Sequence, residues 1–204
     1  TSTGVLDVDI SAGSSTLVLT DGAQSTGKNI YLRLHGTLAA SRTVTMPVTA
    51  ERVWIMKDDT VRGTSNYTVG VLTASGTTQP IPPGATVLCK SNGSETVVSI
   101  IEKGYETITD ANSPYTVVAG AQILANTTST TITVTLPAAA STGDEVTIID
   151  ARGTWGSNNL TVGRNGLKIN SGTADLTLSN NGQSITLVYV DATRGWAYKT
   201  NYTS

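Results

Sequence analysis

The chain has 204 residues, of which 38% are hydrophobic and only 14% are charged, and its formal net charge at neutral pH is −2. This length fits one large domain or two domains of about 100 residues. Because the charge is close to zero, the chain provides no long-range attraction for nucleic acid or an anionic membrane, and we expect no nucleic-acid partner.

The N-terminal sequence "TSTGVLDVDI" lacks a basic segment followed by an apolar one, and no run of about 18 apolar residues occurs in the chain. These features predict a soluble, unexported protein that does not insert into a membrane. Cys89 is the only cysteine, which excludes an intrachain disulfide and a thiolate metal cluster. Its setting in "TVLCKS" predicts a small strand residue, with a reactive thiol as the alternative.

A near-match to a phosphate-binding loop, "GAQSTGKN", covers residues 22–29. It ends in Asn29, where the motif requires a hydroxyl group to hold Mg²⁺. The alternating sequence that follows predicts a strand, whereas phosphate binding requires the N-terminus of a helix. We therefore expect a hairpin turn here and no nucleotide cofactor.

Alternation with a period of two dominates the chain from residue 30 onward. Apolar and polar residues alternate in "IYLRLH" (30–35), in "ITVTL" (132–136) and in "LTLS" (176–179). This pattern predicts half-buried strands, and glycine-containing turns separate them every 8–12 residues. No segment has the apolar spacing of a helix. The sequence predicts an all-β, mainly antiparallel fold of small sandwich or barrel type.

Two halves of the chain repeat the same short motifs. "TVTMP" (43–47) corresponds to "TVTLP" (133–137), and "NYTVG" (66–70) corresponds to "NLTVG" (159–163). The offsets are similar, so we predict two tandem copies of one domain, residues 1–103 and 104–204, with the same strand order. The predicted core positions are Val44, Met46, Val53, Ile55, Val69, Val134, Leu136, Val146, Ile148 and Val162.

No residue pattern in the chain indicates catalysis. His35 is the only histidine, and no G-x-S-x-G motif is present, so a structural histidine on a solvated strand face is expected. Zinc sites draw on several Cys or His ligands, and no calcium-loop motif occurs. Nothing in the spacing of the acidic residues selects a glycosidase pair. We expect no catalytic residue, no cofactor and no metal, and therefore not an enzyme.

Two loops recur in the two halves, "DDTVRGTSN" (58–66) and "DARGTWGSNN" (150–159). The first aspartate of each is predicted to cap turn amides and to pair with the arginine of its own loop. The tryptophan of the second loop is predicted either to stack on a sugar or a partner protein, or to pack over the end of the barrel. The candidate interaction residues are Asp58, Arg62, Asp150, Arg152, Trp155, Asn158, Asn159 and Trp196.

These blocks also carry a family resemblance. "SRTVTMPVTAERVWIMKDDT", "YTVGV" and "PIPPGATVLCKSNG" resemble β-rich repeat domains of tailed-bacteriophage tail fibres and other tail-tip proteins. The second half, from "YTVVAGAQILANTTST" to the closing "TRGWAY", looks like a related domain of the same class of virion proteins. The resemblance covers nearly the whole chain, but it includes no catalytic residue to transfer.

The resemblance implies a non-catalytic structural component of a tailed phage virion, assembled in the cytoplasm of the host bacterium. The first expectation is a tail fibre or tail-tip protein, an adaptor or a host-attachment protein that contacts other virion proteins and a host cell-surface glycan. Such domains often lie beside fibrous shafts, and this sequence shows none. A capsid decoration protein is therefore the alternative, and a surface-glycan hydrolase is the third candidate.

We also expect a homo-oligomer. Each half is small, phenylalanine is absent and aromatic residues make up 5% of the chain, so an isolated unit should be marginally stable. Trp54, Trp155 and Trp196 are apolar residues that a neighbouring copy could cover. The resemblance implies a trimer, since phage fibres and spikes are usually trimeric. The alternative is a monomer in which these tryptophans close the barrel ends.

Overall fold

The computed structural model describes residues 5–18, 30–47, 52–63, 65–92 and 94–202. These residues form strands joined by turns, with one short 3-10 helix among them, η2 (Asp110–Asn112). By internal contacts the chain divides into two compact units, Thr1–Gly104 and Tyr105–Ser204. Each unit is described by itself.

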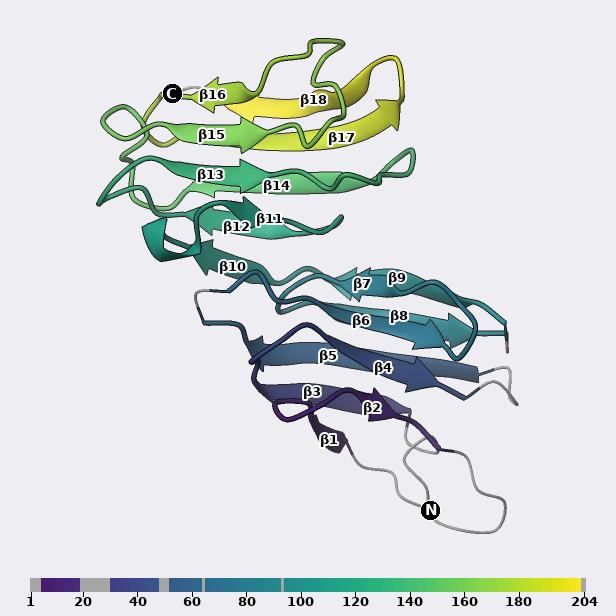
Figure 1. Cartoon of the computed structure of the whole chain (residues 1–204). Helices are drawn as coiled ribbons and strands as arrows, with labels where there is room; N and C mark the ends of the chain where they lie inside the picture. Colours follow the sequence, from purple (N-terminus) through teal and green to yellow (C-terminus); the bar gives the residue numbers. More distant parts are fainter. Residues whose placement is uncertain (1–4, 19–29, 48–51, 64, 93, 203–204) are drawn as a thin grey trace. The chain divides into compact units, whose positions relative to one another are not determined.

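The first unit contains two sheets (Figure 1). The five-stranded sheet has the order β1 (Leu6–Asp9), β3 (Tyr31–Thr37), β5 (Arg52–Val61), β8 (Thr86–Ser91) and β9 (Thr96–Glu102). The four-stranded sheet has the order β2 (Ser15–Thr16), β4 (Arg42–Met46), β6 (Val69–Thr73) and β7 (Gln79–Ile81).

The second unit repeats this arrangement. Its five-stranded sheet has the order β10 (Tyr105–Ile108), β12 (Gln122–Ala125), β14 (Glu145–Asp150), β17 (Ser184–Asp191) and β18 (Gly195–Tyr202). Its four-stranded sheet has the order β11 (Tyr115–Thr116), β13 (Ile132–Thr135), β15 (Leu160–Gly163) and β16 (Leu176–Leu178). Strand for strand, the order is that of the first unit, so the predicted common strand order of the two halves is confirmed.

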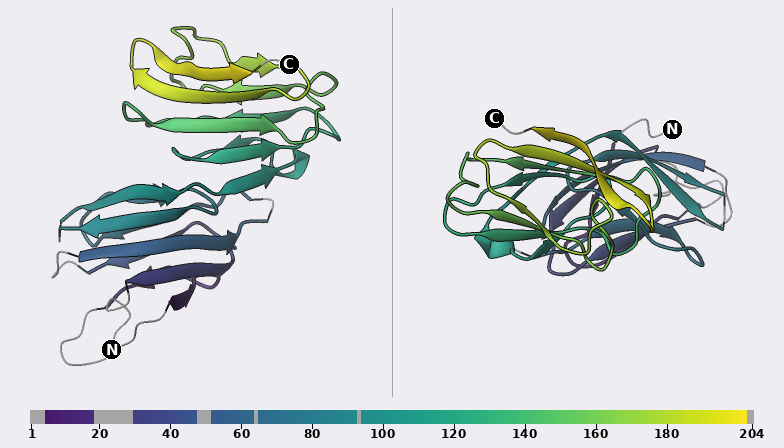
Figure 2. Two further views of the ribbon diagram at one scale, coloured as in Figure 1. Left: turned by 180° about the vertical axis from the view of Figure 1, so that it is seen from behind. Right: turned by 90° about the horizontal axis from the view of Figure 1, so that it is seen from above.

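The path of the chain is a coil rather than a series of hairpins. In the first unit β1, β3 and β5 are parallel neighbours, and between them the chain passes through β2 and β4 in the opposite sheet. Each turn of the coil adds one strand to each sheet, and the same winding in the second unit gives about six turns altogether. Figure 2 shows the paired sheets from two further directions.

Each unit is therefore a β-solenoid, and the predicted mainly antiparallel sandwich or barrel is wrong. Among the described strands eight pairings are parallel, and each antiparallel pairing includes one of the last three strands of its unit, such as β8 with β9 and β17 with β18. The physical reason is that a polar turn can lead the chain into the opposite sheet as readily as back along the same one. Period-two alternation is the same in both cases.

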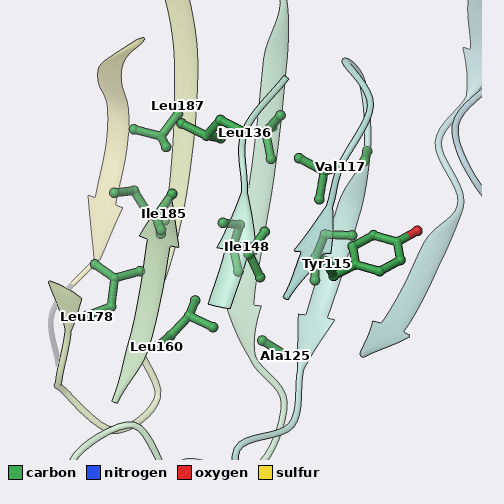
Figure 3. Close-up of a cluster of buried hydrophobic side chains, with 14 of the residues drawn as sticks. Tyr115, Val117, Ala125, Leu136, Ile148, Leu160, Leu178, Ile185 and Leu187 are labelled. Carbon is green, nitrogen blue, oxygen red and sulfur yellow. The ribbon is translucent and has the colours of Figure 1, made fainter. Parts of the chain in front are cut away.

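One apolar core fills the space between the two sheets of each unit. In the second unit Ile148 of β14 lies between Ile123 of β12 and Ile185 of β17, and all three are buried. Leu160 and Leu178 close the core from the four-stranded sheet (Figure 3). Burial of this kind contributes about 1.5–3 kcal/mol for each large aliphatic side chain.

Eight of the ten predicted core residues are buried, and the two exceptions lie next to each other on one strand face. Val53 is 44% exposed and Ile55 is half-buried, whereas Trp54 and Met56 between them are fully buried. A shift of one residue transfers every side chain of a strand to the other face of its sheet.

The prediction gave Val53 and Ile55 the same inward role as Val146 and Ile148. In the structure Asp58 N donates to Ala85 O (3.0 Å) and Asp150 N donates to Gln183 O (3.0 Å), so the two aspartates are equivalent. Counting back from them, Trp54 takes the place of Val146. No residue is inserted between these positions, so Trp54 and Met56, rather than Val53 and Ile55, are the inward counterparts of Val146 and Ile148.

All three tryptophans are fully buried, each within the core of its own unit. Trp54 lies opposite the small Cys89 in the strand pairing, while the equivalent pair in the second unit is Val146 and Leu187. A large and a small side chain thus replace two of medium size. The prediction that a neighbouring copy covers the tryptophans is wrong, because their own chain covers them.

Candidate functional site

The two recurrent loops follow equivalent strands, β5 and β14, and each begins with a buried carboxylate. Asp58 is 1% exposed and Asp150 is 8% exposed. A buried carboxylate is unfavourable unless its oxygens accept hydrogen bonds or an ion pair. The two units satisfy this requirement in different ways.

In the first unit an arginine neutralises the carboxylate. Arg62 Nη2 donates to Asp58 Oδ2, and Arg62 Nε donates to the carbonyl oxygen of Tyr67 at 2.9 Å. The other carboxylate oxygen, Oδ1, accepts from the Thr60 amide (3.1 Å) and hydroxyl (2.6 Å). The predicted pairing of Asp58 with Arg62 is confirmed, and it ties both ends of the loop together.

In the second unit backbone amides replace the arginine. Asp150 Oδ1 accepts from the amides of Arg152 (3.2 Å) and Gly153 (2.9 Å), and Oδ2 accepts from those of Trp155 (3.2 Å) and Gly182 (3.0 Å). Burial raises the pKa of Asp150, but the backbone amides together outweigh it, and the pKa lies below its usual value. The predicted amide cap is confirmed. The predicted ion pair is not formed within the described residues, since the Arg152 side chain is exposed.

The tip of the second loop is held inward. Trp155 is fully buried, and the adjacent Thr154 hydroxyl lies 2.8 Å from that of Thr127. Asn158 Nδ2 donates to the carbonyl oxygens of Thr127 (2.8 Å) and Thr128 (3.2 Å). The predicted stacking of Trp155 on a sugar or a partner protein is therefore wrong in this conformation. Asn159, also predicted at this tip, is half-buried.

Trp196 of β18 is also fully buried, and contacts within its own unit hold it in place. Its amide donates to Lys168 O (2.8 Å), its carbonyl accepts from Asn170 N (2.8 Å), and its ring meets the Tyr189 ring edge-on at a centroid distance of 5.6 Å. Gly195 precedes it with φ of 71°, and a Cβ atom there would lie 2.0 Å from Lys168 O. Only glycine fits this position.

The other residues that could take part in catalysis or metal binding do not come together in a site within the described residues. His35 is half-buried and lies between Asp9 and Asp59 in the strand register. No cluster of three or more His, Cys, Asp or Glu residues is suited to a metal within the described ranges. Cys89 is buried, and desolvation raises the pKa of its thiol to about 12, so the thiolate nucleophile is not formed at neutral pH.

Two further sequence expectations concern membranes and nucleotides. The part of the chain that the structure describes contains no helix long and apolar enough to cross a membrane. The near-match to a phosphate-binding loop, residues 22–29, lies outside the described residues.

A feature that the sequence did not reveal is the outer face of the five-stranded sheet in the first unit. A band of side chains across the strands, two register lines wide, is charged: Arg33 Nε lies 2.6 Å from Asp59 Oδ2, Arg33 Nη1 lies 3.5 Å from Asp7 Oδ1, and Lys57 Nζ lies 3.7 Å from Asp59 Oδ1. We call this group the charged row; it consists of Asp7, Asp9, Arg33, His35, Lys57, Asp59 and Glu102.

A second line of outward side chains runs beside it and is apolar. Strand register places Tyr31 of β3 beside Ile55 of β5, and Ile55 beside Leu88 of β8. We call these three residues the apolar row. Two more exposed apolar residues, Val53 and Val97, lie on its far side and flank Lys90. The assignment of Val53 and Ile55 to the core concealed this row in the sequence.

Comparison with known proteins identifies no family. Neither a family model nor a curated protein matches the chain. Among solved structures it is similar to a chain described as "Structure of a chaperone-substrate complex", with 16% sequence identity and a TM-score of 0.41. The similarity covers 97% of this chain and 36% of the length of that one.

Proposed function

We propose that the chain is a structural, non-catalytic component of a tailed-bacteriophage particle, in the tail fibre or at the tail tip. The proposal rests first on the resemblance of its strand and turn motifs to tail-fibre and tail-tip domains. The observation that supports it best is the tandem arrangement of two solenoid units with one strand order. A repeated packed unit can serve as a structural element without any need for an active site.

The use of buried polar groups supports the same function. In both recurrent loops the carboxylate is fully engaged in holding its own backbone, by Arg62 in one unit and by amides in the other. A catalytic carboxylate needs an oxygen that can reach a substrate. These loops are built as structural anchors.

In this proposal the chain works as a homotrimer, a number that the resemblance supplies. The buried tryptophans no longer support oligomerisation. Host attachment, to a glycan or another surface molecule, would involve exposed loop residues such as Arg152 rather than Trp155.

Position in the particle tests the proposal. Antibodies raised against the purified chain are applied to phage particles whose peptide map contains it, and the labelled particles are viewed by electron microscopy. We expect label at the tail. Label spread over the shell would replace the proposal by capsid decoration, and label at neither place on these particles would refute both.

The hydrolase alternative has its own assay. Purified chain is incubated with polysaccharide from the host surface, and reducing sugar is measured with time. We expect no release above a heat-denatured control. Steady release in proportion to protein concentration would refute the non-catalytic function.

A further inference from the structure

We infer that Asn165 is a site of spontaneous deamidation in this chain, and that Asp150 protects the matching Asn181 from the same reaction. The inference goes beyond the proposed function and does not depend on it. It rests on a comparison of two Asn-Gly turns in the second unit, at residues 165–166 and 181–182. A third Asn-Gly pair, at residues 92–93, includes a residue outside the described ones and takes no part in the comparison.

The reaction needs only the chain and water. The backbone nitrogen that follows an asparagine loses its proton to hydroxide and attacks the side-chain carbonyl carbon, Cγ. The new N–Cγ bond closes a cyclic succinimide, and the Cγ–Nδ2 bond breaks as ammonia leaves with a proton from water. A second water then opens the ring at either carbonyl, which gives aspartate or isoaspartate. A following glycine favours the attack, because it has no side chain to crowd the nitrogen.

The two turns are closely matched in exposure and in backbone geometry. Both asparagines and both glycines are exposed. The glycines have φ of 86° and 71°, and a Cβ atom added at either would meet nothing within 4 Å, so each turn has room to rearrange. A backbone hydrogen bond closes the first turn, from Leu167 N to Arg164 O (3.0 Å). The second turn is closed in the same way, from Gln183 N to Asn180 O (3.3 Å).

The side-chain amide of each asparagine is also held by the rest of the unit. Asn165 Nδ2 donates to Leu136 O at 2.9 Å. Asn181 Oδ1 accepts from the Gly156 amide at 2.7 Å. The contact at Asn181 polarises its carbonyl carbon, which favours attack there. The side-chain contacts therefore do not account for protection of Asn181.

The protection comes from the contact of the attacking nitrogen. Gly182 N donates to Asp150 Oδ2 at 3.0 Å, so its proton lies against a buried carboxylate. A hydrogen bond to an anion opposes loss of that proton and holds the nitrogen in place. Gly166 N has no hydrogen-bond partner among the residues that the structure describes. The nitrogen next to Asn165 can therefore react, whereas the one next to Asn181 is engaged.

Deamidation at Asn165 would alter the connection between β15 and β16. The side-chain amide of Asn165 ties this turn to Leu136, the residue that follows β13. An aspartate would place a carboxylate oxygen against the Leu136 carbonyl, acceptor against acceptor. An isoaspartate would add a methylene group to the backbone of a turn in which Asn165 has φ of 50°. Either product loses the tie, so the second unit loses one contact with age.

The test follows both sites in the parent chain. The folded chain is incubated at pH 8, and samples taken over time are digested with trypsin and mapped by mass spectrometry with fragmentation. Cleavage after Arg164, Lys168 and Arg194 places the two asparagines in different peptides. We expect Asn165 to deamidate at least about tenfold faster than Asn181, which corresponds to about 1.4 kcal/mol in activation free energy. Equal rates, or a faster reaction at Asn181, would overturn the inference.

A measurement in denaturant separates the fold from the local sequence. In the unfolded chain Asp150 no longer holds the Gly182 amide, and each asparagine is still followed by glycine. We expect the two sites to react at comparable rates in concentrated urea. A difference as large as that in the folded chain would show that the local sequence causes it, and would overturn the role of Asp150.

The variant Asp150→Asn tests the protecting residue directly. We expect the Asn181 rate to rise several-fold while the Asn165 rate stays the same, with circular dichroism used to check that the strands are retained. Asp175→Asn is the matched control, because this exposed carboxylate accepts from the Arg164 amide (3.0 Å) and should leave the Asn181 rate unchanged. An unchanged Asn181 rate in folded Asp150→Asn, or an equal rise in the control, would overturn the inference. If Asp150→Asn does not fold, the comparison of the parent chain with and without urea decides.

Discussion

Replacement of Asp150 by asparagine removes the charge from a site where four backbone amides converge on two carboxylate oxygens. The asparagine oxygen can accept from one pair of amides, but its NH₂ group then faces the other pair, donor against donor. Hydrogen bonds to a charged group contribute about 1.5–3 kcal/mol each, and the losses at one site are not additive. We expect Asp150→Asn to lower the free energy of unfolding by about 2–4 kcal/mol at pH 7.

The loss should depend on pH. Because the pKa of Asp150 is lower in the folded chain than in the unfolded chain, its charge stabilises the fold above the unfolded pKa of about 3.9. That contribution disappears as the pH falls from there through the folded pKa. The difference between parent and variant should therefore be constant from pH 5 to 7 and shrink below about pH 4.

Urea unfolding at several pH values, followed by the fluorescence of the three buried tryptophans, of which Trp155 and Trp196 lie in the second unit, measures this difference. Asp175→Asn is the matched control, since that exposed carboxylate accepts only the Arg164 amide (3.0 Å) among the contacts described, and we expect it to cost under about 1 kcal/mol. A loss for Asp150→Asn below about 0.5 kcal/mol, or one that is the same at pH 3 and pH 7, would refute the reasoning.

Three further predictions concern the cores and the first loop. Arg62→Ala leaves the Asp58 carboxylate buried without its cation and should destabilise the first unit by about 3–5 kcal/mol in thermal unfolding; a change under 1 kcal/mol would contradict the ion pair's role. Ile148→Ala should cost about 2–5 kcal/mol in denaturant unfolding, whereas Val53→Ala should stay within about 0.5 kcal/mol, and equal losses would contradict the assigned strand faces. Cys89 should resist a thiol reagent at pH 8 in the folded chain and react in denaturant, because burial raises its pKa to about 12; rapid labelling of the folded chain would show that it is accessible.

The sequence predicted the parts of the fold that depend on local pattern. Alternation identified the strands, and the repeated "TVTMP" and "TVTLP" identified two units of one strand order, with residues such as Val44 and Val134 in the cores. Strand pairing is not local, however. Whether a glycine-containing turn sends the chain back along its own sheet or across to the opposite one depends on contacts between distant residues, so a parallel solenoid was mistaken for an antiparallel sandwich.

For the candidate site residues, too, the sequence predicted local contacts but not contacts between distant residues. The aspartate of each recurrent loop was identified, because a carboxylate followed by small polar residues is typical of an amide cap. The burial of Trp155 and Trp196 was not, since composition does not reveal which large side chain fills which gap. The prediction of Val53 and Ile55 as inward residues, in place of Trp54 and Met56, reversed the strand face of β5 and hid the apolar row.

Electron cryomicroscopy of purified phage particles that contain this chain tests the central proposal most directly. The account predicts density at the tail with threefold symmetry, into which three copies of the two solenoid units fit. Density for the chain on the capsid shell, or density at the tail without threefold symmetry, would contradict it.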